Sequence, residues 1–131
     1  MDEVPIRSGD DVVRVRQQVR NAAADNGLSL VDQTKLVTAA SELARNTLVH
    51  GGGGAARVEV VKSANGRVGV KLYFTDQGPG ITDIELALTD GWTTGTGLGL
   101  GLSGTRRLVD EFELTSAPGA GTSVVVVKWS R

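Results

Sequence analysis

The stretch RVEVVKSANGRVGVKLYFT, residues 57–75, holds two runs of alternating apolar and polar residues on either side of a polar turn. Such alternation is typical of strands with one buried face, and Asn65-Gly66 is a strong signal for a tight hairpin turn. The stretch therefore predicts two antiparallel strands, Arg57 to Lys62 and Arg67 to Thr75.

Before this hairpin the sequence has the periodicity of two helices. Ser8 and Asp10 offer caps for the first, which we expect to run to about residue 27. The second helix is expected to start near Ser29 or Asp32 and to run to His50, where a run of glycines ends it. The apolar positions expected to face the core are Val12, Val15, Val19 and Ala22 in the first helix, and Leu36, Ala39, Ala40, Leu43 and Thr47 in the second.

After the hairpin, residues 76–104 show little regular pattern apart from a possible helical turn at residues 81–88. A loop of that length is typical of a lid or a binding loop. Arg106 to Phe112 is predicted to be helical, and two strands follow, Glu113 to Ala117 and Thr122 to Trp129, around a Pro-Gly turn. The order predicts an α+β fold in which one layer of helices covers a mostly antiparallel sheet.

Composition narrows the class of protein. With 131 residues, we expect one domain spanning 1–131. The 14 Lys and Arg nearly balance the 15 Asp and Glu, so no basic surface is expected to attract nucleic acid. The chain has no cysteine, no leader pattern and no apolar run of membrane-spanning length. We therefore expect a cytoplasmic protein with neither nucleic acid nor membrane as a partner.

Glycine is unusually frequent, at 18 residues, and it alternates with other residues from Gly95 to Gly104. Such a run lets the backbone approach a ligand and cradle phosphate oxygens, and a helix after it adds the positive end of its dipole. A glycine-rich linker is an equal interpretation of the run alone. The sequence lacks the Gly-Lys-Ser/Thr of a P-loop and the strand-helix context of a dinucleotide fingerprint.

Two further motifs carry chemistry. In Asp76-Gln77-Gly78-Pro79-Gly80-Ile81 an acidic side chain follows a strand, where an Asx turn is the simpler interpretation. In Ser41-Glu42-Leu43-Ala44-Arg45-Asn46 the carboxylate and the amide stand at i and i+4, so both project from one face of a helix. Such a pair suits a proton acceptor and a Mg²⁺ ligand, although a solvated helix face is more common.

Taken in order, Glu42-x-x-x-Asn46, Asp76-x-Gly78-x-Gly80 and the glycine run resemble the N box and the two glycine boxes of the GHKL superfamily. That resemblance implies the Bergerat ATP-binding fold, a two-layer sandwich whose mixed, mostly antiparallel sheet is covered on one face by about three helices. Nearly the whole chain is similar to the RsbT family of serine/threonine switch kinases of the stressosome.

The resemblance also implies roles for single residues. Glu42 would be the general base, Asn46 would hold Mg²⁺ and Asp76 would accept a hydrogen bond from the adenine amino group. The cation for the γ-phosphate would be Arg106, at the expected helix start, or Arg45. The other residues implied to lie at the nucleotide are Gly78, Gly80, Ile81, Thr96, Gly97, Leu98, Gly99, Leu100, Gly101, Leu102, Ser103 and Thr122. For Thr122, an ordinary strand position is nearly as good an interpretation.

The implied partners are STAS-domain proteins as substrates and a PP2C-type phosphatase that the kinase activates afterwards. The alternative is an anti-sigma factor of the RsbW and SpoIIAB type, which shares the boxes and the kinase chemistry. The ATP domain of a histidine kinase is less favoured, because no phosphoacceptor helix pair is present. The one histidine, His50, suits the end of a helix.

Overall fold

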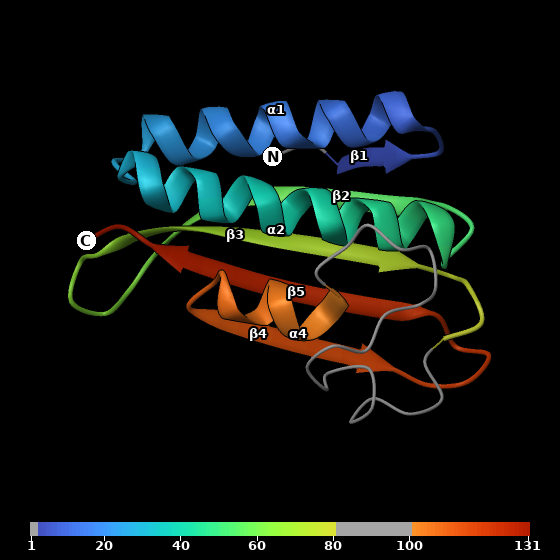
Figure 1. Cartoon of the computed structure of the whole chain (residues 1–131). Helices are drawn as coiled ribbons and strands as arrows, with labels where there is room; N and C mark the ends of the chain where they lie inside the picture. The colour runs from blue at the N-terminus through green and yellow to red at the C-terminus, as the bar shows by residue number, and fades with distance from the viewer. Residues whose placement is uncertain (1–2, 81–100) are drawn as a thin grey trace.

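The computed structural model describes residues 3–80 and 101–131 of the chain. Within these residues five strands form one sheet in the order β1-β2-β3-β5-β4, and every neighbouring pair is antiparallel. Figure 1 shows the helices on one face of this sheet. The two-layer α+β sandwich expected from the sequence is therefore confirmed. The elements are β1 (Glu3–Ile6), α1 (Gly9–Asp25), α2 (Leu30–Val49), β2 (Gly54–Lys62), β3 (Val68–Asp76), α4 (Gly101–Arg107), β4 (Glu111–Ser116) and β5 (Thr122–Trp129).

The first two helices begin and end close to where the sequence predicts. Ser8 precedes α1 in an extended conformation, and Ser29 caps α2 because its side chain accepts a hydrogen bond from the Asp32 N–H. The C-cap of α2 is His50, whose N–H donates to the Asn46 carbonyl. The expected inner residues of α2 are all buried, and those of α1 are buried except Val12, which packs against the core.

The central hairpin is confirmed, with Gly66 at a φ of +85° in its turn. β2 starts at Gly54, three residues earlier than expected, and β3 extends one residue further, to Asp76. The N-terminal residues, which carry no strand prediction, form the edge strand β1 because Val4 and Ile6 alternate into the core.

The helix predicted at Arg106 to Phe112 is wrong. α4 spans Gly101–Arg107, so it starts inside the glycine run rather than after it, and β4 already begins at Glu111. Burial explains the shift: Leu102, Ser103 and Thr105 are buried, and this tertiary packing offsets the poor helix propensity of glycine. Phe112 packs against the core from the strand instead.

The core lies between the helices and the sheet. Its buried residues come from every element of the described part except β4, which adds Phe112 and Leu114 at its margin. Because α2 contacts α1, α4, β1, β2, β3 and β5, it is the central helix of the layer. None of the helices in residues 3–80 and 101–131 is long and apolar enough to cross a bilayer.

Candidate functional site

One row of residues crosses the sheet at the end where β3 stops. Gly54, Asp76, Thr122 and Ser116 are successive cross-strand partners from β2 to β4. Side chains alternate between the faces of a sheet, so Asp76 lies on the same face as the buried Phe74, under the helix layer. The row therefore lies at the edge of the helix-covered face, where the side chains of Asp76, Thr122 and Ser116 are polar and half-buried.

The last turns of α2 lie over this same end of the sheet (Figure 1). Glu42 and Asn46 are both half-buried and stand one helical turn apart. Asn46 follows Asp32 by about four turns of 3.6 residues, so the two side chains leave α2 on similar sides. Asp32 reaches Lys128 on β5, so Asn46 lies on the side of α2 that faces β5, with Glu42 one turn before it.

A glycine tract joins α2 to the row. The Gly53 N–H donates to the Thr47 carbonyl, and a β-carbon on Gly54 would lie 2.8 Å from the Thr47 methyl group. A β-carbon on Gly51 would lie 2.6 Å from Asp76 Oδ2. The sequence identifies this tract as a helix stop and as part of the family resemblance, but not as a contact with Asp76. Its length, four consecutive glycines, is the signal that a close backbone approach is needed there.

Asp76 is held by the turn that follows β3. Its Oδ1 accepts a hydrogen bond of 2.9 Å from the Gly78 N–H, which is the Asx turn that the sequence allows. Gly78 packs on Gly51, where a β-carbon would lie 2.7 Å from the Gly51 α-carbon. Gly121, with a φ of +76°, packs against the Asp76 carbonyl. Backbone thus surrounds Asp76 on three sides.

Two hydroxyl groups extend the row beyond Asp76. Thr122 Oγ1 lies 2.9 Å from Ser116 Oγ, and Ser116 Oγ donates a hydrogen bond of 2.9 Å to the Gly121 carbonyl. Sequence reasoning points to Thr122 and misses Ser116. A serine beside a threonine across the strand hairpin of residues 111–129 is the only signal available, and it is weak.

The remaining predicted site residues fall into three groups. Ile81, Thr96, Gly97, Leu98, Gly99 and Leu100 lie outside the described residues. Gly101, Leu102 and Ser103 form the first turn of α4, which contacts α2. The expectation that Arg106 lies at a helix start is wrong, because it lies in the last turn of α4. Arg106 and Arg45 are both exposed.

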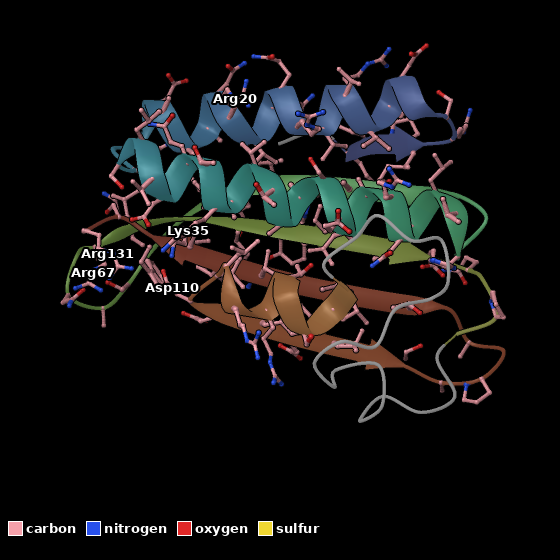
Figure 2. The ribbon with its side chains drawn as sticks, viewed as in Figure 1. Arg20, Lys35, Arg67, Asp110 and Arg131 are labelled. Carbon is pink, nitrogen blue, oxygen red and sulfur yellow. The ribbon has the colours of Figure 1, made fainter. Side chains whose placement is uncertain are left out.

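A separate charged cluster lies at the opposite end of α2. Lys128 Nζ is 3.6 Å from Asp32 Oδ1 and 3.5 Å from Asp110 Oδ1, and Arg131 Nε is 3.3 Å from Asp32 Oδ2. Burial raises the pKa of Asp32, but attraction to Lys128 and the contacts with Arg131 and Ser29 outweigh it, so the pKa lies below its ordinary 3.8. Figure 2 shows Asp110 and Arg131 on the same side of the molecule, and Asp110 accepts from the Trp129 N–H at the end of β5 opposite to Thr122.

Comparison with known proteins identifies relatives of this chain. The family described as histidine kinase-, DNA gyrase B- and HSP90-like ATPase matches residues 31–130. The serine/threonine-protein kinase RsbT of Bacillus subtilis is 46% identical over 121 residues, covering 92% of this chain and 90% of that protein. An anti-sigma F factor of Halalkalibacterium halodurans is 33% identical over 101 residues, covering 74% of this chain and 69% of that protein.

Solved structures share the fold. A crystal structure of RsbU and RsbW domains from Mycobacterium tuberculosis superposes with a TM-score of 0.62 at 20% identity, covering 100% of this chain and 33% of that longer one. The mycobacterial sensor histidine kinase MprB gives a TM-score of 0.59 at 22% identity, covering 99% and 97% of the two chains.

Proposed function

Because this chain belongs to the family of histidine kinase-, DNA gyrase B- and HSP90-like ATPases, we propose that its polar row binds ATP and that Glu42 directs the γ-phosphate to a protein hydroxyl. The chain is a serine/threonine protein kinase, as its 46% identity to RsbT supports. One observation supports the assignment of the site: the Gly51 N–H donates to the Asn46 carbonyl at the end of α2, and the Gly51 backbone packs against Asp76 at the end of β3.

The base of the nucleotide lies at the Asp76 end of the row. Asp76 Oδ1 is engaged by the Gly78 N–H, which leaves Oδ2 as the acceptor for an adenine amino group. Guanine carries an oxygen at that place and would meet a carboxylate without a donor between them. Gly78 and Gly80 keep the chain beside the base free of side chains. Thr122 is the neighbour of Asp76 in the row.

The phosphates lie toward α2 and α4. In the described part of the chain no three acidic or histidine side chains converge on a metal cage. A Mg²⁺ ion would therefore take the Asn46 amide oxygen and rely on phosphate oxygens for other ligands, which is how Mg²⁺ is ordinarily held. The amide of Asn46 is half-buried and fits this role. The run Gly97 to Ser103 is the proposed lid over the phosphates.

The transfer step needs one base and one cation from the chain. The oxygen of a substrate serine or threonine attacks the γ-phosphorus, Glu42 takes the hydroxyl proton, and the bond to the bridging oxygen breaks to release ADP. Arg45 shares a helical turn with Glu42 and Asn46, whereas Arg106 lies at the end of α4, so we propose Arg45 rather than Arg106 as the cation for the γ-phosphate.

The partners proposed for the kinase follow from its relatives. RsbT and the anti-sigma F factors support a partner-switching pathway. We propose a cytoplasmic, stressosome-type kinase whose substrates are STAS-domain proteins and which then activates a PP2C-type phosphatase. Anti-sigma activity is the second candidate, favoured by identities of 29% to 33% to anti-sigma F factors. A stable complex with a sigma factor that blocks transcription would identify it.

The test uses the purified chain, Mg·ATP labelled at the γ-phosphate and a purified STAS-domain protein. We expect label on a serine or threonine of that protein. Glu42→Gln should remove the transfer while ATP still binds, because the base is not part of the binding contacts. Asp76→Asn should instead weaken ATP binding. Failure of the wild type to label any STAS protein, or transfer by Glu42→Gln at the wild-type rate, would rule out the proposal.

A further inference from the structure

The two hydroxyl groups at the end of the row have a defined direction. Ser116 has a single hydroxyl proton, and it is donated to the Gly121 carbonyl, which can only accept. In the contact of 2.9 Å between Ser116 Oγ and Thr122 Oγ1 either hydroxyl can donate, and the bond from Ser116 to the Gly121 carbonyl favours Thr122 as the donor. The Thr122 hydroxyl therefore turns its proton toward Ser116 and keeps only lone pairs for any other partner.

Asp76 is the cross-strand partner of Thr122, with side chains on the same face. Side chains opposite each other in an antiparallel pair have β-carbons about 5 Å apart. The Asp76 carboxylate also has only lone pairs to offer, since Oδ1 already accepts from Gly78. Asp76 and Thr122 therefore stand next to each other as two groups that can accept a hydrogen bond from a ligand but cannot donate one.

We propose that Ser116 is a positioning residue for base selection, acting through Thr122. Because Ser116 holds the Thr122 hydroxyl as an acceptor, Asp76 and Thr122 together match an exocyclic amino group, which has two N–H bonds to donate. A base with an oxygen in that place, such as hypoxanthine or guanine, meets two acceptors. Without Ser116 the Thr122 hydroxyl rotates, donates to that oxygen and admits the base. This inference rests on the proposed ATP site.

The test compares the binding of ATP and inosine triphosphate in the presence of Mg²⁺ by titration calorimetry. Inosine triphosphate carries an oxygen where adenine has its amino group. We expect Ser116→Ala to reduce the ratio of the two dissociation constants about tenfold, which is the usual effect of one hydrogen bond. Ser116→Thr keeps the hydroxyl and should restore the wild-type ratio. Glu113→Ala, on the other face of β4, is the matched control and should leave the ratio unchanged.

The outcomes distinguish the positioning role of Ser116 from the proposed ATP site. An unchanged ratio in Ser116→Ala, or equal weakening of both nucleotides, overturns the positioning role while the ATP site stands. No ATP binding by the wild type overturns the proposed function itself. Should Ser116→Ala fail to fold, Thr122→Val gives the same decision: we expect it to weaken ATP selectively, and an unchanged ratio in that variant overturns the inference.

Discussion

The backbone of Gly51 packs directly against the side chain of Asp76: a β-carbon on residue 51 would lie 2.5 Å from Asp76 Cβ and 2.6 Å from Oδ2. Gly51 follows the C-cap of α2, and Asp76 is the last residue of β3. The spacing between the helix that carries Glu42 and the carboxylate proposed to bind the base is thus set by a contact in which one partner has no side chain.

Gly51→Ala should displace Asp76 and weaken ATP binding at least about tenfold, with a loss of about 1–3 kcal/mol in the free energy of unfolding, as overpacking usually costs. Calorimetric titration and urea unfolding would measure the two effects. Gly9→Ala is the control, because a β-carbon there has no neighbour within 4 Å. Wild-type ATP affinity in Gly51→Ala would show that this close approach is not required.

Gly121→Ala and Gly66→Ala form a matched pair with φ angles of +76° and +85°. In both variants the left-handed backbone at the new alanine lowers the free energy of unfolding by about 1–2 kcal/mol. Only Gly121 packs on a neighbour, the Asp76 carbonyl, whereas Gly66 has open space around it. Gly121→Ala should therefore lose roughly 1–3 kcal/mol more than Gly66→Ala in urea unfolding. Equal losses would contradict the packing at Gly121.

Asp32→Asn should destabilise the fold by about 3 kcal/mol at pH 7, because the buried Lys128 loses one of its two carboxylates. The pKa of Asp32 is lowered by folding, so its contribution is present above about pH 3.8 and is lost as the pH falls through the lowered pKa. The difference between variant and wild type should shrink in acid. Urea unfolding at pH 7 and pH 3 would measure it, with the exposed Asp25→Asn as control. A difference that stays constant down to pH 3 would refute the ion-pair explanation.

Arg45→Ala should slow phosphate transfer more than Arg106→Ala, by at least about tenfold, since a cation near the γ-phosphate stabilises the charge of the transition state. Both side chains are exposed, so each variant should keep its stability within about 0.5 kcal/mol. Initial rates of transfer at saturating ATP would separate them. If Arg106→Ala transferred phosphate more slowly than Arg45→Ala, Arg106 would be the cation at the γ-phosphate instead.

Local signals account for the parts of the fold that the sequence predicts. Ser29 as a cap, the helical spacing after it and the Asn65-Gly66 turn each act over a few residues, and α2 and the central hairpin appear as expected. The helix after the glycine run was misplaced because Leu108, Val109 and Phe112 have helical spacing, although Phe112 is a strand residue. Burial of Leu102 and Thr105 decided the outcome, and only tertiary contacts determine burial.

For the candidate site, too, the sequence predicts what local motifs carry and misses what depends on tertiary contacts. Glu42, Asn46, Asp76 and Thr122 are predicted as site residues from the sequence, and the last turns of α2 and the end of β3 lie at the same end of the sheet. The contacts of Gly51 and Gly121 with Asp76 join residues that are distant in sequence, so no local pattern reveals them. The pairing of Asp32 with Lys128 is likewise a product of the fold alone.

The alignment of Gly54, Asp76, Thr122 and Ser116 also separates the positions that tolerate insertion from those that do not. One residue added inside β5 would turn Thr122 to the opposite face and leave Asp76 without its neighbour. The turn at Asn65-Gly66 closes the other end of β2 and β3, eight residue pairs away from Asp76. A fluorescent reporter inserted in that turn would follow partner exchange while leaving the site undisturbed.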